Sequence, residues 1–137
     1  MILVDTSVII DFLKGVQADA VTLFDDILEN KIPYGINEFI YQEVLQGAKN
    51  LAEYNRLKEY LETIPFYFLL HGRESFEKAA FINFTCRRSG ITIRSTIDLL
   101  IAETAIENSL FLLHKDGDFD NIAKIISELR IYKRNFT

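Results

Sequence analysis

Short apolar runs alternate with longer segments of helical period along this chain, and that alternation restricts the possible folds more than any other feature. The runs cover residues 2–4, 34–36, 66–69, 110–113 and 130–132. Each has the length of a strand, and strands that alternate with helices through short loops are typical of a parallel sheet covered on both faces. We therefore predict an α/β protein, with three α/β/α layers around a small parallel sheet.

The segments between these runs have apolar residues at helical spacing. We expect helices over residues 6–13, 18–30, 37–47, 51–64, 75–88, 97–108 and 119–129. Asn37 and Ser95 or Thr96 stand where N-caps are expected, and Gly15, Gly47 and Gly90 stand where helices end. Since no repeat, linker or change of composition interrupts the chain, residues 1–137 are predicted to form a single domain.

Composition excludes several classes of protein. Of the 137 residues, 49% are apolar and 26% are charged, as in ordinary globular proteins. One cysteine, Cys86, with only His71 and His114, leaves neither an internal disulfide nor a structural zinc site. The beginning of the chain does not resemble a signal peptide, and no apolar stretch is long enough to cross a bilayer. We therefore expect a cytoplasmic protein without a membrane partner.

Three acids stand where a carboxylate is costly to desolvate. Asp5 directly follows the first apolar run, Asp116 comes shortly after the fourth, and Asp98 interrupts the apolar segment Thr96-Ile-Asp-Leu-Leu-Ile-Ala102. The carboxyl ends of parallel strands meet in one crevice, where such acids would repel one another and raise each other's pKa unless a divalent cation held them. The pattern therefore predicts a Mg²⁺ or Mn²⁺ site and a metal-dependent hydrolase.

Each acid also has a purely structural interpretation. Asp5 precedes Thr6 and Ser7 and is a good helix N-cap, while Glu43 lies in a helical segment where most glutamates face solvent. Asp98 is the hardest to explain structurally, because Ser95 or Thr96 already offers a cap.

The segment Lys115-Asp-Gly-Asp-Phe-Asp120 superficially matches a calcium-binding loop. That loop needs Gly at its sixth position and Glu at its twelfth, but counting from Asp116 gives Asn121 and Ser127. We interpret Asp120 as a solvated acid, either the N-cap of a helix or a residue of its first turn. Asp116 and Asp118 are both candidates for the metal site; Asp116 is preferred because it comes first after the strand, and Asp118 is alternatively the N-cap of the last helix.

Taken together, these segments resemble the PIN-domain ribonucleases and, within them, the VapC-type toxins of toxin–antitoxin pairs. The resemblance is carried by Ile2-Leu-Val-Asp5-Thr-Ser-Val-Ile-Ile-Asp-Phe-Leu-Lys-Gly15, Ile40-Tyr-Gln-Glu43-Val-Leu-Gln-Gly47, Gly90-Ile-Thr-Ile-Arg-Ser-Thr-Ile-Asp98-Leu-Leu-Ile-Ala102 and Leu112-Leu-His-Lys-Asp116-Gly-Asp-Phe119. It spans nearly the whole chain. Many relatives have Thr where His114 stands, so the role of that hydroxyl is not carried over.

The resemblance implies a site and a reaction. Asp5, Glu43, Asp98 and Asp116 match the catalytic, metal-binding acids, with Asp118 as a second candidate for the fourth ligand. The implied activity is hydrolysis of RNA phosphodiester bonds with Mg²⁺ or Mn²⁺, by a toxin that a cognate antitoxin protein silences and that forms a homodimer. Thr6 or Ser7 would support Asp5, and the candidates for phosphate contacts are Lys49, Arg87, Arg88 and Arg94.

Two other functions compete with this one. A phosphatase of the haloacid-dehalogenase type would need a second Asp two residues after Asp5, where this chain has Ser7. A catalytically degenerate PIN-like scaffold that only binds proteins is the remaining alternative. The presence of all four acids disfavours it, and a metal titration separates the two.

Overall fold

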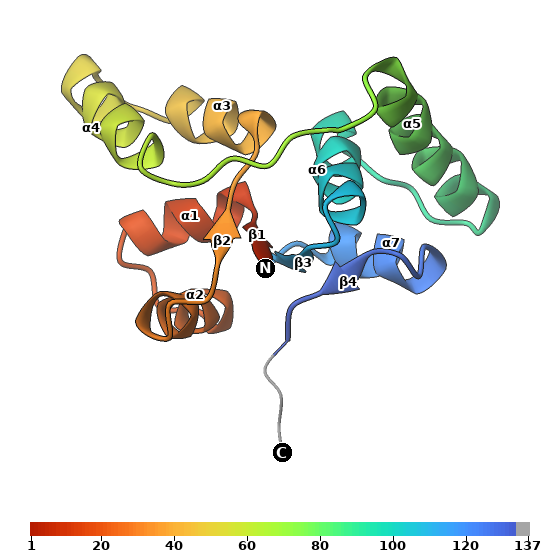
Figure 1. Cartoon of the computed structure of the whole chain (residues 1–137), viewed down its shortest axis with the longest axis horizontal. Coiled ribbons are helices and arrows are strands. Elements are labelled where there is room, and N and C mark those ends of the chain that lie inside the picture. Colours follow the sequence, from red (N-terminus) through yellow and green to blue (C-terminus); the bar gives the residue numbers. More distant parts are fainter. Residues whose placement is uncertain (134–137) are drawn as a thin grey trace.

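The computed structural model describes residues 1–133, and within them four strands form one parallel sheet (Figure 1). The strands are β1 (Ile2–Val4), β2 (Tyr34–Gly35), β3 (Phe111–Leu113) and β4 (Arg130–Ile131). Their order is β2-β1-β3-β4, with Ile2 opposite both Tyr34 and Phe111. The chain leaves β1 for β2 on one side and later returns to β3 on the other. The carboxyl ends of β1 and β3 therefore border the switch point where open α/β sheets bind ligands.

Helices cover this small sheet on both sides. They are α1 (Thr6–Leu13), α2 (Asp19–Glu29), α3 (Glu38–Gln46), α4 (Leu51–Leu61), α5 (Arg73–Arg88), α6 (Thr96–Glu107) and α7 (Gly117–Ile125). In Figure 1, α3, α4, α5 and α6 lie above the strands and α2 lies below them. The predicted α/β architecture is confirmed. No helix of residues 1–133 is long and apolar enough to cross a membrane.

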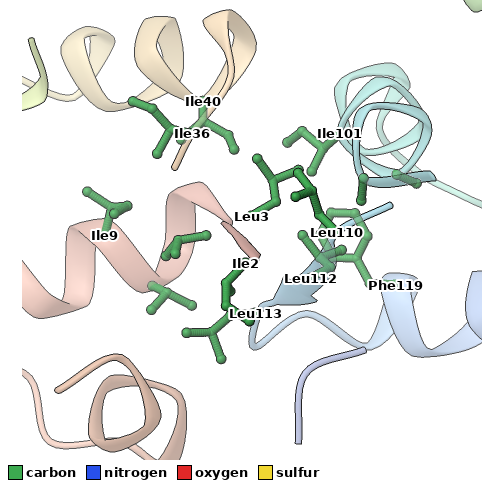
Figure 2. Close-up of a cluster of buried hydrophobic side chains, with 14 of the residues drawn as sticks. Ile2, Leu3, Ile9, Ile36, Ile40, Ile101, Leu110, Leu112, Leu113 and Phe119 are labelled. Carbon is green, nitrogen blue, oxygen red and sulfur yellow. The ribbon is translucent and has the colours of Figure 1, made fainter. Parts of the chain in front are cut away.

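The core forms where the helices meet the two central strands. Leu3 and Leu112 are fully buried, and Ile9 of α1, Ile101 of α6 and Phe119 of α7 pack around them (Figure 2). All three residues of β1 are buried, so neither face of this strand is left to solvent. A strand buried on both faces reads as a continuous apolar run, which is why the sequence indicated it clearly. That residues 1–137 form a single domain remains a prediction.

The strand predicted at residues 66–69 is wrong. Only one bridge forms there, between Ile36 and Phe66, although Tyr67 N also donates to Ile36 O at 2.8 Å. Beyond that point α6 takes the backbone groups that a strand would need: Asn108 Nδ2 donates to Phe68 O at 2.9 Å, and Leu70 N donates to Glu107 Oε1 at 2.7 Å. Residues 66–69 therefore form a connector without regular strand structure, and the side chains of Asn108 and Glu107 fix the backbone of residues 68–70.

Gly35 permits the one bridge that remains. A Cβ atom at this position would lie 2.5 Å from Pro65 O and 2.6 Å from Tyr67 Cε2. Because real Cβ atoms do not come so close, only glycine lets residues 65–67 approach β2. The sequence predicted a weak strand at residues 34–36, but it did not indicate that Gly35 is needed for this close approach.

A carboxyl pair at the far end of α6 joins α5 and this connector. Glu107 Oε1 accepts hydrogen bonds from Leu70 N and, at 3.0 Å, from Ser75 Oγ, while Glu107 Oε2 is buried and needs a donor. Glu103 is 3% exposed, and burial together with the hydrogen bond and charge of Glu107 raises its pKa to about 8. Burial works against ionisation of Glu107 as well, but its donors Glu103, Leu70 and Ser75 hold its pKa below the usual range. These opposite pKa shifts lead us to expect one proton on the pair near neutral pH, held by Glu103.

We expect Glu103→Gln to change the pH dependence of stability. The unfolded chain loses the Glu103 proton near the ordinary pKa of 4.5, whereas the folded protein holds it to about 8, so the stability of the wild type falls as pH rises through this range. Gln can donate to Glu107 without a charge. The melting temperature of Glu103→Gln should match that of the wild type at about pH 5 and exceed it by about 3 °C or more at about pH 9.

Differential scanning calorimetry across this range measures both curves. Lys78, whose charge opposes the pKa shift of Glu103, provides the control. Lys78→Met should steepen the loss of stability with pH, not remove it. Parallel curves for Glu103→Gln and the wild type would show that no proton is shared.

Candidate metal centre

Asp5 begins the site at the carboxyl end of β1. Its backbone N–H continues the sheet by donating to Leu113 O at 2.9 Å, and the residue occupies the N-cap position of α1. Its side chain makes no capping hydrogen bond; instead, Ser7 Oγ donates to Asp5 Oδ2 at 2.9 Å. Asp5 is therefore the N-cap of α1 by position, as its structural interpretation expected, but its side chain does not cap the helix.

Burial governs the electrostatics of Asp5, which is 5% exposed. Burial raises the pKa of Asp5 and the charge of Glu43 adds to this effect, while hydrogen bonds from Ser7 and the Thr6 backbone oppose it. A carboxyl group here is expensive to ionise unless positive charge arrives.

Glu43 reaches the site from the middle of α3. Thr6 Oγ1 donates to Glu43 Oε1 at 2.7 Å, so the first residue of α1 holds the carboxylate of α3 beside Asp5. The sequence suggested that Thr6 or Ser7 would support Asp5. Ser7 does so, whereas Thr6 supports Glu43. Glu43 is partly buried and not a freely solvated surface residue.

Asp98 is the electrostatic centre of the group. It lies in the first turn of α6, where Ser95 Oγ accepts from Asp98 N at 3.4 Å as the predicted cap. Burial raises the pKa of Asp98 most, and with the charges of Asp5, Asp116, Glu43 and Asp118, in that order, it brings this pKa to about 7. Every other acid proposed as a metal ligand from the sequence therefore lies close enough to act on the charge of Asp98.

Asp116 and Asp118 complete the cluster after β3. Asp98, Asp116 and Asp118 can each offer one carboxylate oxygen, and these oxygens lie within 4.8 Å of one another. Asp116 is the N-cap of α7, with its Oδ1 accepting from Asp118 N at 3.0 Å. The N-cap role considered for Asp118 is thus wrong: the helix begins two residues earlier than predicted, and Asp118 lies in its first turn.

The starts of three helices lie beside these acids: α1 at Asp5, α6 before Asp98 and α7 at Asp116. Free backbone N–H groups give a helix N-terminus a partial positive charge that favours nearby anions. This field offsets part of the repulsion between the carboxylates, but the raised pKa values show that the offset is incomplete.

The donor set fits a hard divalent cation. The clustered side chains offer carboxylate oxygens, with neither thiolate nor imidazole among them. Oxygen ligands of this kind suit Mg²⁺ or Mn²⁺. A cation here would also relieve the repulsion that raises the pKa of Asp98.

Other polar residues fall around this group. Asp120 lies in the first turn of α7, one of the two places expected for it. His114 Nε2 lies 3.2 Å from Asp120 Oδ1. Sequence reasoning missed the ion pair of Lys115 Nζ with Asp11 Oδ2, which ties the loop before Asp116 to α1. The sequence gives no signal for this ion pair, because Lys115 and Asp11 are 104 positions apart.

The proposed phosphate-binding cations are spread more widely. The main chain of Arg94 contacts the cluster, with Arg94 N 3.5 Å from Asp118 Oδ2. The guanidinium of Arg88 lies 5.7 Å from the centre of the Phe84 ring, at the other end of α5 from its start. Lys49 borders a different surface, a groove of about 510 Å³ between α1, α3 and α4.

Comparisons with known proteins give a consistent family. Residues 2–125 match the model of the family described as PIN domain. VapC ribonuclease Mb1587 of Mycobacterium bovis and ribonuclease VapC11 of Mycobacterium tuberculosis are each 32% identical over 126 residues, which cover 91% of this chain and 93% of each relative.

Solved structures show the same fold at lower identity. VapBC2 from Rickettsia felis, bound to a DNA fragment from its promoter, matches 98% of this chain and 100% of its own with a TM-score of 0.73 and 16% identity. VapBC-1 from nontypeable Haemophilus influenzae matches 96% and 97% with a TM-score of 0.70 and 22% identity.

The ligand order after β3 can be tested by separate Asn substitutions. We expect Asp116→Asn to weaken Mn²⁺ binding by roughly tenfold or more, about 1.4 kcal/mol, and Asp118→Asn to weaken it less. The reason is that the charge of Asp116 acts more strongly on Asp98 than that of Asp118. Isothermal titration calorimetry measures the affinity.

Melting temperatures in chelator provide the control. Asn caps a helix as well as Asp does, so Asp116→Asn should keep its metal-free stability. If only Asp118→Asn loses affinity, Asp118 is the fourth ligand.

Proposed function

The chain belongs to the PIN-domain family and is a relative of the VapC ribonucleases, and from this premise we propose that it is a metal-dependent endoribonuclease. The observation that carries the proposal is the cluster of Asp98, Asp116 and Asp118 at the switch point, with Asp5 and Glu43 close enough to raise the pKa of Asp98. An acid cluster of this density favours a bound cation over a purely structural role.

RNA is a polyanion, so this cluster cannot receive a phosphodiester without added positive charge. Bound Mg²⁺ or Mn²⁺ would neutralise the phosphate, lower the pKa of a nucleophilic water and stabilise the leaving oxygen. Asp5, Glu43, Asp98 and Asp116 would hold the cation, with Asp118 as the second candidate for the fourth position. The same need explains how a chain of net charge −5 takes a nucleic-acid substrate.

The protein's own groups have separate tasks. One of the carboxylates, Asp98 or Asp116, would orient the attacking water by accepting its hydrogen bond. Ser7 and Thr6 fix the carboxylates of Asp5 and Glu43 by the hydrogen bonds described above.

The surroundings would position the substrate. The N-termini of α1, α6 and α7 favour a phosphate group at the site. Arg94, next to Asp118, is the nearest of the proposed phosphate contacts, and Arg87, Arg88 and Lys49 would contact RNA farther from the centre.

We expect Asp5→Asn and Asp98→Asn each to reduce RNA cleavage by about 10²-fold or more, which corresponds to about 2.7 kcal/mol of transition-state stabilisation. Asn keeps the shape of the side chain and removes the anion that holds the cation. The measurement is the rate of cleavage of a labelled RNA pool by purified protein in excess Mg²⁺.

The stability of the metal-free variants separates chemistry from folding. Asp98→Asn removes one of several mutually repelling charges, so its melting temperature in chelator should equal or exceed that of the wild type. Wild-type cleavage rates in both variants would end the nuclease proposal. Failure to bind Mn²⁺ at all would leave the protein-binding scaffold as the better reading.

The proposal includes a toxin role and two protein partners. An antitoxin segment would occupy the groove between α1, α3 and α4, whose apolar floor includes Ile10, Leu13 and Leu57. A basic side chain from that segment would reach the acids and compete with metal or RNA. We also propose that the protein acts in the cytoplasm, together with its proposed RNA target.

A homodimer would use the exposed side of α5. Phe76, Phe81 and Phe84 are each at least half exposed, and the rings of Phe81 and Phe84 stack with centroids 5.6 Å apart. Neighbouring exposed aromatic side chains are more typical of a protein–protein interface than of a helix face that stays in contact with solvent.

We expect the free wild type to be a dimer by light scattering and Phe81→Glu to be a monomer, because a charge at the centre of an apolar interface is not compensated. Leu51→Glu is the matched control, since Leu51 is 73% exposed on α4, outside this face. Co-expression with the adjacent gene should give a co-purifying small protein. A strictly monomeric wild type with no such partner contradicts both parts.

A further inference from the structure

We propose that His114 is a positioning residue for the acid cluster, holding the main chain of Asp116 so that the carboxylates after β3 face Asp98. The inference rests on the proposed function for the meaning of the cluster, but its evidence is separate. The side chain of His114 is 4% exposed, although the residue stands in a loop at the edge of the site. A ring buried so deeply beside exposed acids is held by specific contacts.

Both ring nitrogens are engaged. Asp116 N donates to His114 Nδ1 at 2.9 Å, and His114 Nε2 lies 3.2 Å from Asp120 Oδ1. Because Nδ1 accepts the amide hydrogen, the ring proton belongs on Nε2, where it donates to Asp120. The ring of Phe119 packs against the imidazole with centroids 5.1 Å apart.

The histidine therefore links the N-cap of α7 to the first turn of the same helix. Asp116 has an extended backbone, with φ −101° and ψ 127°, and its amide lies outside the helical hydrogen-bond pattern. With this amide fixed by His114, Asp116 Oδ1 can accept from Asp118 N at 3.0 Å. One chain of contacts thus runs from the imidazole through Asp116 to Asp118, both members of the cluster.

The alternative is that His114 contributes only its packing against the ring of Phe119. The two roles differ in which ring nitrogen matters, and two substitutions separate them. The amide oxygen of Asn can take the place of Nδ1 and accept from Asp116 N, whereas the longer Gln reaches the place of Nε2 and can contact only Asp120. Both remove the ring, so both lose the same packing on Phe119.

The experiment measures Mn²⁺ affinity by calorimetry for the wild type, His114→Asn and His114→Gln, together with melting temperatures in chelator. We expect the two variants to melt at similar temperatures, and His114→Gln to bind Mn²⁺ at least about fivefold more weakly than His114→Asn, within the range that outer-shell contacts usually control. Equal affinities for the two variants would overturn the proposal.

A measurement on the unaltered protein keeps the test independent of how the variants fold. At about pH 8, where an ordinary imidazole is neutral, the ¹⁵N shifts of the His114 ring report which nitrogen carries the proton. The proposal requires it on Nε2; a proton on Nδ1 would exclude acceptance from Asp116 N and overturn the proposal.

The control Asp98→Asn distinguishes this inference from the function on which it rests. Loss of Mn²⁺ binding in that control, with equal affinities for the two histidine variants, refutes only the positioning role. Unchanged Mn²⁺ affinity in the control counts against the metal centre itself.

Discussion

Repulsion among carboxylates at the ends of β1 and β3 is the constraint around which this protein is built. Asp5, Asp98 and Asp116 come from three distant parts of the chain, and burial together with their mutual charge raises the pKa of Asp98 to about 7. The free energy for this arrangement comes from the apolar core beneath it, where Leu3, Leu112 and their neighbours are fully buried. Stability is thus spent to hold like charges together, which is characteristic of functional sites.

Hydrogen bonds from nearby helices decide where each carboxylate points. Thr6 and Ser7 are adjacent in sequence, yet one binds Glu43 and the other Asp5, so a single turn of α1 orients two acids. On the other side of the site, His114 and the Lys115–Asp11 pair hold the loop that carries Asp116. The site is therefore fixed from both sides of the switch point.

Much of this could be read from the sequence. β1 is buried on both faces and gives an unbroken apolar run, so residues 2–4 were recognisable as a strand. The apolar run 110–113 likewise indicated β3, although Phe111 is exposed, and acids after these runs indicated the candidate site. The strand predicted at residues 66–69 was wrong because side chains about 40 positions away bind the backbone there. Asn108 donates to Phe68 O, and Glu107 accepts from Leu70 N. The Asp11–Lys115 pair was not predictable for the same reason, since its members are 104 positions apart. The contacts of the His114 ring with Asp116 and Asp120 are local, but they follow no periodic pattern in the sequence. Local pattern reports burial and period, whereas long-range polar contacts leave no periodic trace.

Helix α1 contributes residues both to the acid cluster and to the groove between α1, α3 and α4. Its first residue holds Glu43 beside Asp5, while Ile10, Leu13 and Lys14 toward its other end line the groove; α3 likewise carries both Glu43 and the groove residue Val44. A helix of eight residues rises only about 12 Å. An extended peptide covers that distance in about four residues. Any chain seated in the groove thus lies within a very short tether of the acids, and substitutions that reshape α1 to change one surface will also move the other.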